Sequence, residues 1–232
     1  MTSPLADSLR AAFQDCCDMD ASLGERLDAF AASVRAINAP FAEAVDRLVA
    51  RLQKAEVGAG APRVGDLLPP FYLPDEKGRI VSLDALQRHA PVAVIVHRGH
   101  WCPYCRINTR ALAQARSRIE ATGGQVVAIV PDRQRYAAAI QVEAQADFPI
   151  LTDMDNGYAM SLNLVFWVGA EMQDFMSRAG LDLAEYQGNE SWMVPVPATF
   201  VVGRDKRVKA RFVDPDYRKR MTIESLLAAM RL

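Results

Sequence analysis

The sequence predicts an α/β fold in which a central mixed sheet, flanked by helices, follows a helical extension. Beyond residue 62, runs rich in β-branched residues, such as PVAVIVHR and GQVVAIVP, alternate with amphipathic helical stretches. Residues 4–55 instead carry apolar side chains at helical spacing throughout. Alternating strands and helices favour helices on both faces of one sheet, and a final strand hairpin predicts that one edge is antiparallel.

The extension, residues 1–57, is predicted to be a helical hairpin. One apolar stripe ends near Ile37, Pro40 interrupts the pattern, and a second stripe starts at Phe41. The following VGAGAPRVGD is rich in glycine and marks a linker. We therefore expect a separate domain over residues 62–232.

Within that domain the elements follow one another closely. FYLPDEKGRIVSL predicts two short strands around a turn, and residues 103–121 a helix that ends at a Gly-Gly pair. The later segments predict a helix, a short strand, a helical turn, a hairpin and a closing helix, in DRQRYAAAIQVEAQA, FPILTD, DNGYAMSLNL, ATFVVGRDKRVKARFV and TIESLLAAMRL. Residues 164–192 fit neither a strand nor a tight turn, and we expect a helical insertion packed on the domain.

Composition excludes several classes of function. The formal net charge of the 232 residues is −1, with basic residues scattered singly, so neither nucleic acid nor an anionic membrane is an expected partner. The first residues do not resemble a secretory signal, and no apolar run has the length of a membrane span. We expect a cytoplasmic protein.

The residues that carry chemistry are Cys102 and Cys105, in HRGHWCPYCR. Cys102 falls where a buried strand gives way to a helix, with Pro103 at the first helical position, so helix N–H groups should stabilise its thiolate. Cys105, one turn further, is expected to be more buried, less ionised and able to resolve a disulfide with Cys102. Positive charge could come from Arg98, Arg106 and two nearby histidines.

Two other interpretations of the pair remain open, a zinc half-site and an inert buried pair. Zinc requires a second ligand pair, but Cys16 and Cys17 are adjacent, and His97 and His100 flank the same strand end. Redox chemistry is favoured, and it requires neither a metal nor another cofactor. Cys16 and Cys17 are expected to be small buried thiols.

Several motifs carry a family resemblance. The strand–WCPYC–helix arrangement resembles the thioredoxin superfamily, and CPYC is typical of glutaredoxins. RGHWCPYCR, VGDLLPPFYLPDEKGRIVSL, LTDMDNGYAMSLNL, VPVPATFVVGRDKRV and FVDPDYRKR together resemble the peroxiredoxin-like branch of the alkyl hydroperoxide reductase/thiol-specific antioxidant family, over about residues 62–232. The resemblance implies a thioredoxin-like fold and a thiol oxidoreductase.

The sequence departs from peroxiredoxins where they bind peroxide. Their Thr or Ser, Pro and Arg correspond here to Gly99, Ile95 and Pro197. Those groups orient peroxide and stabilise the leaving oxygen, so their loss weighs against fast peroxidase chemistry. Pro197 instead fits the cis-proline of disulfide reductases, which lets the backbone at Val196 pair with an extended substrate; an ordinary trans proline that opens an edge strand is the alternative.

The remaining candidates are expected to shape the site. Trp101 is expected to cover the dithiol at its rim, and Tyr104 either lines a thiol-binding groove or faces solvent. Asp132, directly after a strand, is a candidate proton acceptor. DPDYRKR is expected to be surface structure.

The sequence thus predicts a thiol-disulfide oxidoreductase that cycles a Cys102–Cys105 dithiol and disulfide, with an external thioredoxin or glutathione system as reductant. A thiol-dependent hydroperoxide reductase is the alternative, and a redox-sensing binding module is a third. The apolar helices ahead of the domain also raise the expectation of a homodimer.

Overall fold

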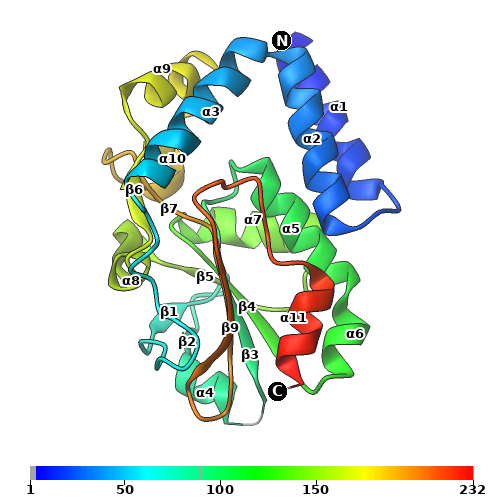
Figure 1. Ribbon diagram of the computed structural model, residues 1–232, viewed down its shortest axis with the longest axis vertical. Helices are drawn as coiled ribbons and strands as arrows, with labels where there is room; N and C mark the ends of the chain where they lie inside the picture. The colour runs from blue at the N-terminus through cyan, green and yellow to red at the C-terminus, as the bar shows by residue number, and fades with distance from the viewer. Residues whose placement is uncertain (1–3, 89, 232) are drawn as a thin grey trace.

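A five-stranded mixed sheet forms the centre of the molecule (Figure 1). The computed structural model describes residues 4–88 and 90–231. The strand order is β5-β4-β3-β8-β9, and the strands are β3 (Val92–Val96), β4 (Gln125–Val130), β5 (Ile150–Thr152), β8 (Ala198–Val202) and β9 (Val208–Val213). Strands β3, β4 and β5 are parallel to one another, whereas β8 and β9 form an antiparallel edge. The α/β thioredoxin-like fold predicted from the sequence is confirmed.

Helices surround this sheet. They are α5 (Pro103–Gln114), α6 (Arg116–Glu120), α7 (Gln134–Ala144) and α11 (Ile223–Met230). Strand β3 is buried along its whole length, because both of its neighbours in the sheet and the helices on its faces cover it. A continuous run of apolar residues therefore marks a central strand here.

The N-terminal extension contains three helices, α1 (Pro4–Asp18), α2 (Leu23–Ile37) and α3 (Ala39–Lys54), where the sequence predicted two. Ser22 and Glu25 form a capping box at the start of α2, and the Asn38 side chain caps α3. Helices α1 and α2 lie beside α5, while α3 contacts α9 (Figure 1). The apolar core runs without interruption from these helices into the sheet.

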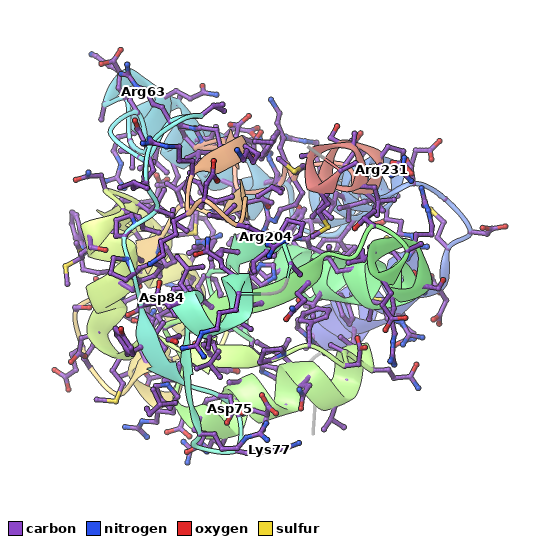
Figure 2. The ribbon with its side chains drawn as sticks, turned by 90° about the horizontal axis from the view of Figure 1, so that it is seen from below. Arg63, Asp75, Lys77, Asp84, Arg204 and Arg231 are labelled. Atoms are coloured by element: carbon purple, nitrogen blue, oxygen red, sulfur yellow. The ribbon has the colours of Figure 1, made fainter. Side chains whose placement is uncertain are left out.

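Two smaller sheets accompany the main one. Strands β1 (Tyr72–Pro74) and β2 (Ile80–Ser82) form the predicted hairpin, followed by α4 (Leu83–Gln87). In its turn, Asp75 accepts the backbone N–H groups of Lys77 and Arg79, both at 2.9 Å, and the turn lies at the surface of the molecule (Figure 2).

The insertion at residues 164–192 is mainly helical, but its first residues form a strand that pairs with the residues directly after it. It contains β6 (Val165–Trp167), α9 (Ala170–Arg178) and α10 (Leu183–Gln187), and β7 (Met193–Pro195) follows it. Strands β6 and β7 are antiparallel, so the expectation that this stretch contains no strand is wrong. Before it, η1 (Met154–Asn156) and α8 (Gly157–Ser161) form the predicted helical turn. No helix within residues 4–88 and 90–231 has the length and hydropathy needed to cross a membrane.

Candidate active site

The dithiol lies at the carboxyl end of β3, where the chain turns into α5. Cys102 is the N-cap residue of α5 and Pro103 occupies the first turn. The Cys102 N–H donates to Gly99 O at 3.2 Å, which closes the loop 97–101, and the Cys105 N–H donates to Cys102 O at 3.1 Å. The two cysteines therefore face each other across one helical turn, and both are free thiols.

Both sulfurs are sealed from solvent, and they share a hydrogen bond. Cys102 and Cys105 are each 1 % exposed. The Cys105 sulfur accepts the backbone N–H of Arg98 at 3.4 Å and the guanidinium Nη2 of Arg220 at 3.4 Å. Cys102 Sγ makes no capping hydrogen bond to the backbone of α5.

These contacts place the negative charge of the pair on Cys105. Burial acts to raise the pKa of Cys105, but the hydrogen bond from Cys102 and the neighbouring Arg220 and His97 side chains hold this pKa well below its ordinary value. Burial raises the pKa of Cys102 well above its ordinary value, and the neighbouring Cys105 raises it further. These directions oppose the expectation that Cys102 is the more ionised thiol, and the hydrogen bond from Cys102 and the nearby Arg220 account for the direction at Cys105.

Arg220 belongs to the segment 214–222 between β9 and α11, which crosses beside α5 (Figure 1). Its Nη1 donates to Lys219 O at 2.6 Å and to Tyr217 O, and the side chain is buried. Arg218 in the same segment donates to Asp46 of α3 at 2.8 Å. DPDYRKR is thus a cover over the dithiol, and its assignment to surface structure is wrong for its buried residues Asp216, Tyr217 and Arg220.

A chain of aromatic and cationic contacts forms the wall of the site. The Arg98 guanidinium lies 3.9 Å from the Tyr217 ring centroid and 4.7 Å from that of Trp101. Tyr217 packs on Tyr104 with ring centroids 5.5 Å apart, and Tyr104 packs on Phe30 of α2 at 5.1 Å. Trp101 and Arg98 therefore border the dithiol, whereas Tyr104 is buried against the N-terminal helices and neither faces solvent nor forms an open groove.

Asp132 follows β4, whose carboxyl end lies beside that of β3 because the two strands are parallel. Its Oδ2 accepts the backbone N–H of His100 at 2.5 Å. Asp132 is fully buried, and this burial raises its pKa to about 7, since removal from water disfavours the carboxylate. A negative charge at Cys105 raises the pKa of Asp132 further, so this carboxyl group and the dithiol interact electrostatically.

Arg106 points away from the dithiol. Its Nη2 pairs with Glu143 of α7 at 2.7 Å, and its guanidinium lies 4.3 Å from the Phe13 ring centroid. Cys17 and Arg106 line a cavity of about 390 Å³ among α1, α5 and α7 that contains neither Cys102 nor Cys105. Cys16 and Cys17 are buried, and burial raises both pKa values.

Val196 and Pro197 lie beside the loop that leads to the dithiol, because Ala198 pairs with Val96 at the end of β3. All peptide bonds in the described ranges 4–88 and 90–231 are trans, so the expectation of a cis bond before Pro197 is wrong. The Val196 N–H already donates to Leu164 O at 2.8 Å, at the base of the insertion. This internal bond occupies the donor that an extended substrate would require.

Metal ligation finds no support in the side chains around the dithiol. Within residues 4–88 and 90–231, no group of three or more His, Cys, Asp or Glu side chains is arranged to bind a metal ion. His97 is buried, and its Nε2 lies 3.2 Å from Thr109 Oγ1, which in turn donates to Cys105 O at 2.9 Å. His97 therefore anchors the first turn of α5.

Comparison with known folds relates the chain to peroxiredoxins of known structure. It is similar to peroxidoxin BcpB from Mycobacterium tuberculosis, with 20 % identity, 73 % of this chain and 97 % of that chain covered, and a TM-score of 0.57. Peroxiredoxin 6 of Arenicola marina aligns with 15 % identity over 72 % of this chain and 71 % of that one, with a TM-score of 0.55. Xanthomonas campestris peroxiredoxin Q aligns with 12 % identity, 69 % and 89 % coverage, and a TM-score of 0.52.

The three TM-scores show a shared fold. Comparison with curated proteins found no match. The model of the AhpC/TSA family matches residues 64–211, which include the dithiol, the insertion and all of the sheet except the end of β9. The chain therefore belongs to the AhpC/TSA family.

Proposed function

We propose that the protein is a thiol-dependent oxidoreductase that cycles Cys102 and Cys105 between a dithiol and a disulfide. The observation that carries this proposal is the pair itself, in which a thiolate at Cys105 is stabilised by Arg220 and by the Arg98 amide while Cys102 holds the proton. A thiolate next to a thiol one helical turn away is the arrangement that forms and breaks a disulfide. An external thiol of the thioredoxin or glutathione type would reduce that disulfide.

We propose a small hydroperoxide as the oxidant. Both sulfurs are 1 % exposed, so a protein disulfide could not contact either of them while the segment 214–222 is in place. A hydroperoxide has only two reacting oxygens and requires far less space. The trans Pro197 and the internally bonded Val196 N–H also argue against docking of an extended peptide.

The reaction begins when the Cys102 proton moves to Cys105 along their hydrogen bond. The Cys102 thiolate, next to the positive charge of Arg98, attacks one peroxide oxygen. The O–O bond breaks, Cys102 becomes a sulfenic acid, and the departing alkoxide or hydroxide takes up a proton. Cys105 then loses its proton and attacks the sulfenic sulfur, which forms the disulfide and expels hydroxide that is protonated to water.

Reduction of a small disulfide is the second candidate, favoured by Gly99, Ile95 and Pro197 at the three positions where peroxiredoxins hold peroxide. In that reaction Cys102 attacks one sulfur of the substrate, forms a mixed disulfide and releases the other half as a thiol. Cys105 then resolves the mixed disulfide.

One set of measurements separates these functions. The reduced protein should react with hydrogen peroxide far faster than free cysteine does, and the product should be a Cys102–Cys105 disulfide. In Cys105→Ser the reaction should stop at a sulfenic acid on Cys102, whereas Cys102→Ser should lose the fast reaction. A peroxide rate equal to that of free cysteine, with a mixed disulfide trapped in Cys105→Ser by a model disulfide, would establish disulfide reduction instead. Inactivity in both assays would leave a redox sensor.

A further inference from the structure

Two polar side chains converge over the backbone of Gly99, directly before the dithiol. Gly99 has a φ of +133°, and a Cβ at this position would lie 2.5 Å from Asp132 Oδ1 and 2.7 Å from Trp101 Nε1. Both distances are too short for a carbon atom, so a glycine is required here. The absence of a side chain lets the carboxyl group and the indole N–H approach each other.

Neither of these two atoms has a hydrogen-bond partner in the part of the chain that the structure describes. Asp132 Oδ1 and Trp101 Nε1 are both buried, and Asp132 as a whole is 0 % exposed. A buried polar atom without a partner is costly because it has lost its hydrogen bonds to water, so such atoms point to a bound group. The two atoms do not hydrogen-bond each other, but their distances from this Cβ position put them at most about 5 Å apart, a separation that one oxygen atom hydrogen-bonded to both could bridge.

This pair of atoms lies beside the reacting sulfurs. Trp101 is adjacent to Cys102 in the chain, and the Gly99 carbonyl accepts the Cys102 N–H at 3.2 Å. The Arg98 guanidinium packs on the Trp101 ring at 4.7 Å, which holds the indole in place. Asp132 interacts electrostatically with Cys105, and its Oδ2 is fixed by the His100 N–H at 2.5 Å, which leaves Oδ1 directed at Gly99.

We propose that Asp132 and Trp101 form the subsite for the leaving oxygen of a hydroperoxide. This inference rests on the proposed peroxide chemistry and names its catalytic acid. As Cys102 attacks one peroxide oxygen, the O–O bond breaks and the other oxygen receives the bonding electron pair. Trp101 Nε1 donates a hydrogen bond to that oxygen, and Asp132 transfers its carboxyl proton to it, so that it leaves as an alcohol or water.

The proton balance of the site fits this role. A site with one proton on the thiol pair and one on Asp132 holds the two protons that conversion of a hydroperoxide into an alcohol and a water consumes. The carboxyl group can carry its proton near neutral pH because burial raises the pKa of Asp132 to about 7. Among the described residues, the titratable groups that interact with it electrostatically are Cys105 and the Tyr186 hydroxyl, and the His100 backbone N–H donates to its Oδ2.

The test compares two reagents on the same reduced protein. Hydrogen peroxide requires a stabilised leaving oxygen, whereas iodoacetamide reports only the nucleophilicity and accessibility of the thiolate. Asp132→Asn preserves the shape of the side chain but cannot transfer the proton, and it should lower the peroxide rate constant about 100-fold. Trp101→Phe removes the N–H donor while it keeps an aromatic ring beside Arg98, and it should lower the peroxide rate constant about 10-fold. Alkylation of both variants should stay within about twofold of wild type.

Matched controls account for general damage to the fold. Trp167→Phe changes an exposed indole on β6, and Gly65→Ala places a methyl group at a φ of +93° with no atom within 4 Å. Both should keep the wild-type peroxide rate, whereas Gly99→Ala should lose it.

Each outcome decides the proposal. If wild type reacts rapidly with peroxide and Asp132→Asn and Trp101→Phe are equally fast, the subsite is refuted while the peroxidase function stands. If both variants lose peroxide and alkylation rates in parallel, their effect is on the thiolate and the subsite is again refuted. If wild type reacts no faster than free cysteine, both the peroxidase function and the subsite fail.

Discussion

Replacement of Arg220 by methionine tests whether this guanidinium sets the charge of the dithiol. Methionine keeps most of the buried apolar stem but removes the Nη2 donor, which lies 3.4 Å from Cys105 Sγ. At this distance and an effective dielectric constant of about 20, the Coulomb attraction between a guanidinium and a thiolate is about 5 kcal/mol. The guanidinium also loses hydration when it is buried, so we take the net value from hydrogen bonds to charged groups, about 1.5–3 kcal/mol.

With about 1.4 kcal/mol per pKa unit, Arg220→Met should raise the lower apparent pKa of the thiol pair by about 1 to 2 units. The measurement is the ultraviolet absorbance of the thiolate as a function of pH in the reduced protein. If Cys105→Ser loses the absorbance that wild type shows at the lower pKa, the charge belongs to Cys105. Cys102→Ser should then keep a thiolate absorbance that appears at a higher pH than in wild type.

Arg211→Met is the matched control. Arg211 also donates to backbone carbonyls, those of Ala61 at 2.9 Å and Pro62 at 3.2 Å, but it contacts no sulfur. This variant should leave the thiol titration unchanged. An Arg220→Met protein that is folded and titrates as wild type does would refute the argument, because the Arg98 amide and the helix terminus would then suffice to hold the charge.

Three further predictions concern the segment 214–222, Asp132 and the aromatic wall of the site. Arg218→Ala removes the link between segment 214–222 and Asp46, so a bulky maleimide should label the thiols several-fold faster, and equal labelling would mean that the link does not restrain the cover. Asp132 has a folded pKa of about 7 against 3.8 unfolded, so folding takes up a proton and stability falls as pH rises from about 4 to 7, by at most about 4 kcal/mol. Urea unfolding of Asp132→Asn should show a flatter pH dependence in this window, and an unchanged slope would contradict the burial argument. Phe30→Ala removes the ring that packs on Tyr104 at 5.1 Å and should lower the free energy of unfolding by about 3–5 kcal/mol; a loss below about 1 kcal/mol would show that α2 does not support the wall.

The strands and most helices were predictable because their signals are local. The run Val92–Val96 is apolar and β-branched at every position, as a central strand must be, and Pro103 marks the start of its helix. The strand Val165–Trp167 was missed because three residues are too few to show an alternating pattern, and only its pairing with Met193–Pro195 defines it. The turn 19–22, which separates the first two helices, has no proline or glycine to reveal it.

The two cysteines were predictable for the same reason, since their spacing fits one helical turn. The contact between Cys105 and Arg220 was not, because Arg220 lies 115 positions further along the chain. Nothing in the polar segment around Arg220 indicates that this side chain contacts Cys105. The sequence likewise could not predict whether the peptide bond before Pro197 is cis or trans. The path of the backbone there depends on tertiary contacts, such as the hydrogen bond between Val196 and Leu164.

The N-terminal helices support the residues around the dithiol, although the sequence separates them by a glycine-rich linker. The Phe30 ring packs on Tyr104, and Tyr104 packs on Tyr217. The Tyr217 ring in turn contacts the Arg98 guanidinium, which lies near Cys102. Asp46 holds the other end of the same cover through Arg218. Because a guanidinium stacked between rings keeps its charge while it is shielded from water, these contacts fix a cation beside the dithiol and also restrict which oxidants reach it. A change in the packing of α2 or α3 would therefore alter thiol reactivity without any contact with a sulfur atom.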